Sequence, residues 1–100
     1  MNIQQLMQQA QKMQRQMKEN QVKMEGTDFA GVAAGGAVGV IMNGLYVVKS
    51  VTIQPDLLDK DEVELLQDAI VIAINDAKNK VDAANKNSLG AMSGALNGLM

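Results

Sequence analysis

The chain has 100 residues, one phenylalanine, one tyrosine and a formal net charge of −2. It contains no cysteine and no histidine, which excludes disulfides, thiolate nucleophiles, imidazole bases and the usual zinc sites. One domain of this length buries only a modest core. Because it has so few aromatic anchors, we expect a homodimer whose two copies share a core.

The charges are segregated along the chain. Residues 1–23 carry four cations against one anion, whereas residues 50–76 carry seven carboxylates against one lysine. Residues 77–100 are again basic, with three lysines against one aspartate. Segregated charge creates an oriented field even when the total charge is slightly negative.

Residues 2–23 are predicted to form a helix. They are rich in Gln, Lys, Arg and Met, and neither glycine nor proline interrupts them before Gly26. Their apolar residues follow a heptad pattern over three repeats: Ile3, Leu6, Ala10, Met13, Met17 and Met24. We expect Met13 and Met17 on this seam to contribute to the core or the dimer contact.

The opposite side of this predicted helix carries Lys12, Arg15 and Lys18. Such a ridge is most often a solvated helix face. A second interpretation is a stripe that follows DNA phosphates, since the surrounding glutamines can contact phosphates or base edges without repelling DNA. The residues alone leave both interpretations open.

Residues 29–48 form an uncharged stretch of twenty residues, which is the length of a membrane span. We reject a span because five of the twenty are glycines and because Asn43-Gly44 between two β-rich segments is a strong hairpin signal. We also reject a nucleotide-binding loop, because neither the G-x-x-x-x-G-K-[ST] nor the G-x-G-x-x-G pattern is present.

The stretch therefore predicts an antiparallel sheet of three strands. We expect a short first strand at Lys23–Glu25, a flexible loop over 26–36 around Phe29, a second strand over 37–42 and a third over 46–54. Val40 and Met42 lie on one side of the second strand and are predicted core residues. Lys49 shares a face with apolar residues, so it must lie near an edge or extend outward.

A second long helix is predicted from an Asp59 N-cap to about Lys86. Acidic residues in its first turns suit the helix dipole, which explains much of the negative charge without a metal or acid–base site. Ile70 and Ile74 belong to a segment that is apolar all round, so a second subunit is the expected cover. Beyond Val81 the helix becomes polar and basic. In the tail, Ser88 could cap a short helix that three glycines would fray.

Three segments together resemble the YbaB/EbfC family of bacterial nucleoid-associated proteins: "NIQQLMQQAQKMQRQM", "GAVGVIMNG…VKSVTIQPDLL" and "DEVELLQDAIVIAINDA". Gln54 and Ile74 depart from residues common in that family. The resemblance implies a cytoplasmic homodimer in which helices project from a shared sheet core and bind DNA. By region and charge, it points to Lys12, Arg15 and Lys18 on the first helix, and more weakly to Lys78, Lys80 and Lys86 on the last.

We therefore predict an α+β fold in a single domain of residues 1–100, with an ordered core over 1–86 and a flexible tail over 87–100. The predicted function is that of a nucleoid-associated protein that binds double-stranded DNA with little sequence specificity, alters its conformation and helps to organise the nucleoid. The alternative is a cytosolic homodimeric protein-interaction module with incidental DNA affinity. We expect no catalysis, cofactor, metal, membrane partner or small-molecule substrate.

Overall fold

The structure is a computed structural model that describes the backbone of residues 2–97 and the side chains as far as Asn87. Its main elements are helix α1 (Ile3–Glu25), strands β1 (Asp28–Ala33), β2 (Val38–Asn43) and β3 (Val48–Ile53), and helix α2 (Val63–Asn97). Short 3-10 turns η1 (Ala34–Gly36), η2 (Pro55–Leu57) and η3 (Lys60–Glu62) connect them. The predicted α+β order of helix, antiparallel sheet and helix is confirmed.

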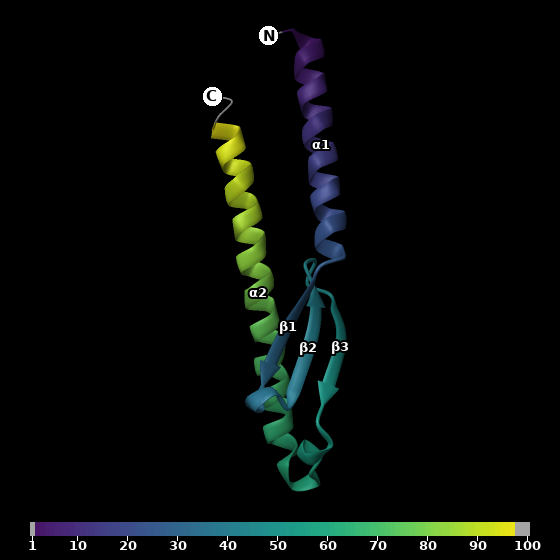
Figure 1. Ribbon diagram of the computed structural model, residues 1–100, viewed down its shortest axis with the longest axis vertical. Coiled ribbons are helices and arrows are strands. Elements are labelled where there is room, and N and C mark those ends of the chain that lie inside the picture. Colours follow the sequence, from purple (N-terminus) through teal and green to yellow (C-terminus); the bar gives the residue numbers. More distant parts are fainter. Residues whose placement is uncertain (1, 98–100) are drawn as a thin grey trace.

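The molecule is elongated, with extents of 69 × 20 × 16 Å. The sheet lies against the first part of α2, and α1 and the second part of α2 project from the same end of the sheet (Figure 1). The turns η2 and η3 lie at the opposite end (Figure 1). Both described chain ends therefore lie on two arms that rise beside each other.

Helix α1 begins where Asn2 caps it, with the side-chain oxygen accepting a hydrogen bond of 2.8 Å from the Gln5 backbone N–H. The predicted helix is confirmed, but the predicted strand at Lys23–Glu25 is wrong because these residues form the last turn of α1. The Thr27 hydroxyl donates to the Lys23 carbonyl at 2.7 Å and helps to close this turn.

The first strand lies instead in the segment that we predicted as a flexible loop. Strand β1 pairs with β2 from Asp28↔Asn43 to Ala33↔Val38, and Phe29 packs against the core. Gly31 is needed in this strand because β1 passes very close to α2 there. A Cβ atom there would lie 2.0 Å from the Ala73 carbonyl oxygen of α2, so only glycine allows β1 to approach the helix so closely.

The β2–β3 hairpin is confirmed, although its connection is longer than Asn43-Gly44. Asn43 is the last residue of β2, and residues 44–47 form the loop. The pairing shifts between Ile41↔Ser50 and Met42↔Val48, which leaves Lys49 as the extra residue of a bulge. Lys49 lies on an edge strand as expected, and its ammonium pairs with Asp28 at 3.0 Å.

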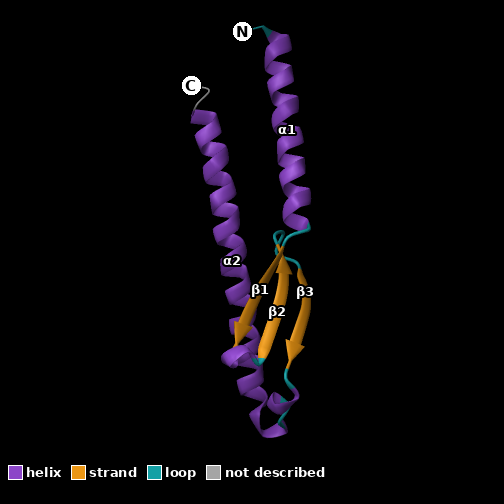
Figure 2. Ribbon diagram, viewed as in Figure 1, coloured by secondary structure: helices purple, strands orange, loops and turns teal. Residues whose placement is uncertain are grey.

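The core lies between α2 and one face of the sheet (Figure 2). Val38, Val40 and Met42 of β2 alternate inward and are at most 4 % exposed. They pack against a row of residues at helical spacing on α2: Ala69, Ala73, Ala77 and Val81. The partly buried Ile70 and Ile74 pack beside this row. Met13 and Met17 of α1 lie outside this core and are 38 % and 56 % exposed.

The predicted cap residue Asp59 caps η3, where its carboxylate accepts a hydrogen bond from the Asp61 N–H at 2.9 Å, and α2 follows directly from Val63. The helix then continues without a break to Asn97, so the separate tail helix that we predicted from Ser88 is wrong. Alanine, leucine and methionine favour helix on both sides of the tail glycines. The flexibility of 87–100 stays a prediction, and residues 98–100 lie outside the described chain.

The uncharged stretch 29–48 forms most of β1, all of β2, their connections and the first residue of β3. The hairpin in it was predicted, whereas β1 replaces the predicted loop. Across the described residues, no helix combines the length and the apolar character that crossing a bilayer would need.

Candidate nucleic-acid interface

Helix α1 is an arm with almost no contact to the rest of its own chain. From Ile3 to Glu19 every residue is exposed, and Met24 in the last turn is the one buried residue of the helix. Lys12, Arg15 and Lys18 therefore all face solvent. None of these three cations has an ion-pair partner among the side chains described up to Asn87, so their charges are available to an anionic ligand.

The lysines of α2 are in a different situation. Lys78 pairs with Asp82 one turn later at 3.1 Å. Lys80 donates a hydrogen bond of 2.6 Å to the Ala30 carbonyl and lies 3.6 Å from Asp76. Lys86 is exposed and makes no ion pair within the described side chains. Of the three weaker candidates on α2, Lys86 thus has the freest charge.

Asp76 and Lys80 together cover the outer edge of β1. The Asp76 carboxylate accepts a hydrogen bond from the Val32 N–H at 3.0 Å, while Lys80 donates to the Ala30 carbonyl. An open strand edge presents unpaired backbone groups that invite another strand, and these two side chains satisfy two of them. Lys80 therefore has a structural role that its charge alone did not indicate.

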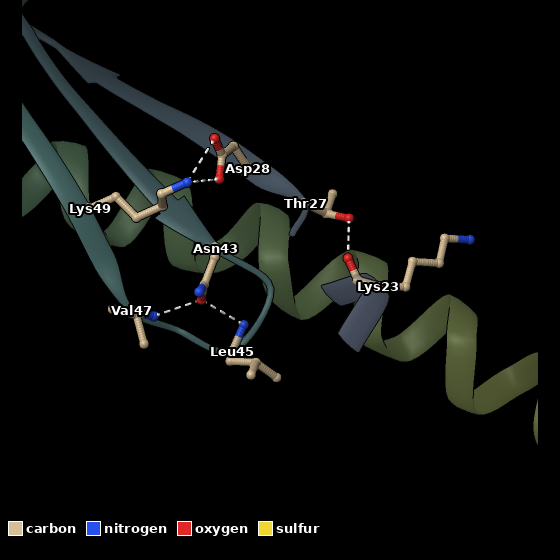
Figure 3. Close-up of polar contacts among 7 residues, drawn as sticks. All are labelled: Lys23, Thr27, Asp28, Asn43, Leu45, Val47 and Lys49. Atoms are coloured by element: carbon tan, nitrogen blue, oxygen red, sulfur yellow. Dashed lines mark hydrogen bonds and ion pairs between the residues drawn. The ribbon is translucent and has the colours of Figure 1, made fainter. Parts of the chain in front are cut away.

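The β2–β3 loop is held in shape by the buried Asn43. Its side-chain oxygen accepts hydrogen bonds from the Leu45 N–H at 2.9 Å and the Val47 N–H at 3.1 Å (Figure 3). This arrangement replaces the tight two-residue turn that Asn-Gly usually signals. The loop also places Tyr46 at φ 66°, in the left-handed region that non-glycine residues rarely adopt.

Tyr46 links this loop to α2. Its hydroxyl donates to the Asp82 carboxylate and accepts a hydrogen bond of 3.2 Å from the Asn85 side chain. The hydrogen bond from Tyr46, together with the hydrogen bond and charge of Lys78, lowers the pKa of Asp82 below its ordinary value. Asp82 is therefore ionised at neutral pH and accepts from both neighbours.

An open cleft of about 710 Å³ lies where α1, the loop and α2 meet. Met17, Met24 and Leu45 form part of its apolar lining, and Lys18 and Asn85 border it. The two arms are thus separated by accessible space near their base.

The two ends of the molecule carry opposite charge. The cations of α1 lie on the arm, whereas the acidic residues of η2, η3 and the first turns of α2 lie at the other end (Figure 1). The elongated shape keeps these regions apart by more than a Debye length of about 8 Å at physiological salt. A polyanion that approaches the arms is therefore largely screened from the acidic end.

Comparison with known proteins identifies the family of the chain. The sequence profile of the YbaB/EbfC DNA-binding family matches residues 1–96. The chain belongs to this YbaB/EbfC family. The resemblance seen in the three sequence segments is thereby confirmed.

Two relatives named "Nucleoid-associated protein" illustrate the extent of the match. One from Chloroflexus aurantiacus is 46 % identical over 99 residues, with 99 % of both chains covered. One from Rickettsia bellii is 46 % identical over 98 residues and covers 98 % of this chain and 89 % of its own. A solved structure, described as an uncharacterized protein from Helicobacter pylori, shares the fold with a TM-score of 0.83 at 27 % identity, covering 92 % and 97 % of the two chains.

The described part of this YbaB/EbfC chain offers little support for a metal site. Its described residues contain no group of three or more acidic, histidine or cysteine side chains that could hold a metal ion. Asp59 caps η3, and Asp61 and Glu62 lie in the first turn of η3, directly before α2. Sequence reasoning missed two contacts, that of Asp76 with the edge of β1 and that of Tyr46 with α2. The only local signal was an isolated tyrosine beside Asn43-Gly44.

Proposed function

We propose that this nucleoid DNA-binding protein holds double-stranded DNA between the projecting arms of a homodimer, with little sequence specificity, in the cytoplasm at the nucleoid. The observation that carries the proposal is the exposed arm α1 with its three unpaired cations, Lys12, Arg15 and Lys18. Lys86 on the second arm adds a further available charge. Binding across two subunits would alter the conformation of the duplex.

Exposed apolar surface supports the homodimer. Met17 and Leu6 on α1, Val51 on β3, and Val71 and Ile72 on α2 are each at least 45 % exposed. Helix α2 covers β1 and β2 but leaves β3 open on the same side (Figure 2). Apolar surface on this scale marks an interaction site, and a second copy presents the same surface in return.

Weak sequence preference follows from the kind of side chains on α1. Lysines, arginine and glutamines on an exposed helix contact phosphates well, and phosphate contacts position a protein without reading the sequence. The single Phe29 is packed against the core, so it is not available to stack on bases.

The test is a titration of a DNA duplex at several salt concentrations with the triple variant Lys12→Ala, Arg15→Ala, Lys18→Ala. If each cation contacts one phosphate in each subunit, the slope of log affinity against log salt should fall by about 5 units. The matched control is Lys23→Ala, Lys49→Ala, Lys60→Ala, which removes the same formal charge at other places. It should keep most of the slope.

Three results would contradict this proposal. Equal losses in the two triple variants would mean that overall charge, and not the α1 ridge, governs binding. Binding that ignores salt would favour the alternative protein-interaction module. Sedimentation of the wild-type chain as a monomer at micromolar concentration would contradict the homodimer.

A further inference from the structure

The base of α1 is held by one close backbone contact. The Gly44 N–H donates to the Met24 carbonyl at 2.8 Å and to the Thr27 carbonyl at 3.1 Å. Both Gly44 and Met24 are buried, whereas nearly all of α1 above them is exposed. The direction in which α1 leaves the sheet is therefore decided at this contact.

Only glycine fits at position 44. A Cβ atom there would lie 2.7 Å from the Met24 carbonyl oxygen and 2.8 Å from the Met24 Cβ atom. Unlike the end of a flexible side chain, these atoms belong to or adjoin the helix backbone, so α1 itself would have to move. Gly44 does not have a positive φ, so its role is the close approach and not an unusual backbone conformation.

The same loop is attached to the other arm. Asn43 fixes the shape of the loop through its bonds to Leu45 and Val47, and the Tyr46 hydroxyl bonds Asp82 and Asn85 on α2 (Figure 3 shows the Asn43 contacts). One side of the loop thus contacts α1 and the other contacts α2. It is a short link between two helices that run beside each other above it (Figure 1).

We infer that the loop 44–47 is the joint that sets the geometry of the arms, and that Gly44 is a positioning residue for DNA binding. The part concerning DNA rests on the proposed function. We assign Gly44 no contact with DNA. It fixes where α1 carries Lys12, Arg15 and Lys18 relative to α2.

A small change at the joint is amplified along the arm. Restoring ordinary contact of about 3.5–4.0 Å at a new Cβ requires a shift of ~1 Å. Helix α1 is about 35 Å long, so a tilt that produces this shift at its base moves its far end by several ångströms. Phosphate contacts cannot all be kept across such a displacement.

The first experiment measures the joint without DNA. Because the chain has no cysteine, Gln9→Cys on α1 and Ala83→Cys on α2 provide two unique sites for spin labels. Both positions are exposed. Pulsed electron resonance gives the distance between the labels, and an excess of unlabelled protein suppresses signals between subunits.

Gly44→Ala should shift this distance by several ångströms. The matched control is Gly26→Ala at the same junction, where a Cβ would lie 3.7 Å from the Val22 carbonyl oxygen and φ is −86°. It should leave the distance unchanged. Tyr46→Phe removes the hydroxyl link to α2 and should broaden the distance distribution, which supplies a second test if Gly44→Ala does not fold. Unchanged distances in both Gly44→Ala and Tyr46→Phe would overturn the inference.

The second experiment measures DNA binding. Gly44→Ala removes no charge, yet it should lower the salt slope by about 1 to 3 units because fewer phosphates are reached together. Gly26→Ala should keep the wild-type slope. A shifted distance with a wild-type slope would refute the positioning role. Failure of the proposed function is detected separately, because the triple cation variant would then bind like its control.

Discussion

The two helices of this protein differ in what holds them in place. Helix α2 packs a row of small residues against the sheet, with Ala73, Ala77 and Val81 fully buried. Helix α1 buries one residue of its own, Met24, and contacts the remainder of the chain at its last turn. The stability of the chain therefore resides in α2 and the sheet, whereas α1 is free to present its charges.

The weak packing of α1 lowers its stability but leaves its cations exposed. Helices in proteins gain most of their stability from packing an apolar face, and the apolar seam of α1 remains uncovered in a single chain. A second copy would cover that seam, and the cations on the opposite side would still face solvent. The same lack of packing that makes α1 weak makes it suitable as an arm.

The largest effect is expected from Gly31→Ala, which disturbs the packing of β1 against α2. The new Cβ would lie 2.0 Å from the Ala73 carbonyl oxygen and 2.5 Å from the Ala77 nitrogen, so β1 and α2 must separate. We expect a loss of about 3 kcal/mol or more in the free energy of unfolding, measured by urea denaturation.

The control for this change is Gly39→Ala on β2, where a Cβ would meet nothing within 4 Å. It should change the free energy of unfolding by no more than about 0.5 kcal/mol. Similar stability of the two alanine variants would mean that the close contact of β1 with α2 is not needed.

A smaller effect is expected from Asp76→Ala, which uncovers the edge of β1. The Val32 N–H loses its acceptor, so the protein should lose about 1 kcal/mol of stability. Hydrogen exchange at the Val32 amide should become faster, while that at amides of β2 changes little. Asp68→Ala, on an exposed residue of the same helix, is the control and should leave exchange at Val32 unaltered.

The smallest effect is expected from the pH dependence of the link between the loop and α2. The Tyr46 hydroxyl and then Lys78 lower the pKa of Asp82, so folding favours its ionised form. This contribution is complete above the ordinary carboxyl pKa of about 4 and is lost as pH falls through the lowered value. Tyr46→Phe should therefore reduce Tm slightly at pH 7, and the difference from wild type should shrink towards pH 3. A difference that grows on acidification would contradict the assignment.

Local patterns predicted the elements whose signals are short in range. The heptad seam marks α1, Asp59 marks the η3 turn that leads into α2, and the β-rich segments around Asn43 mark the hairpin. Each depends on helix periodicity, capping or turn chemistry, which act over a few residues.

The failures have a common cause. Strand β1 contains glycine and alanine and shows little strand propensity, so it was predicted as a loop. It is a strand because β2 pairs with it and α2 covers it. Lys80 stays a predicted DNA contact, but its bond to the Ala30 carbonyl, 50 positions away in the sequence, depends on tertiary packing that local patterns do not show.

The sequence by itself determined two amphipathic helices, a hairpin between them, a basic first segment separated from an acidic middle one, and the family to which these belong. The tertiary structure decided which glycines are indispensable, which lysines are already occupied, and how the α1 arm is attached. These outcomes depend on contacts between elements distant in the sequence, because Gly31 and Gly44 matter only through the backbone atoms of Ala73 and Met24 that they touch.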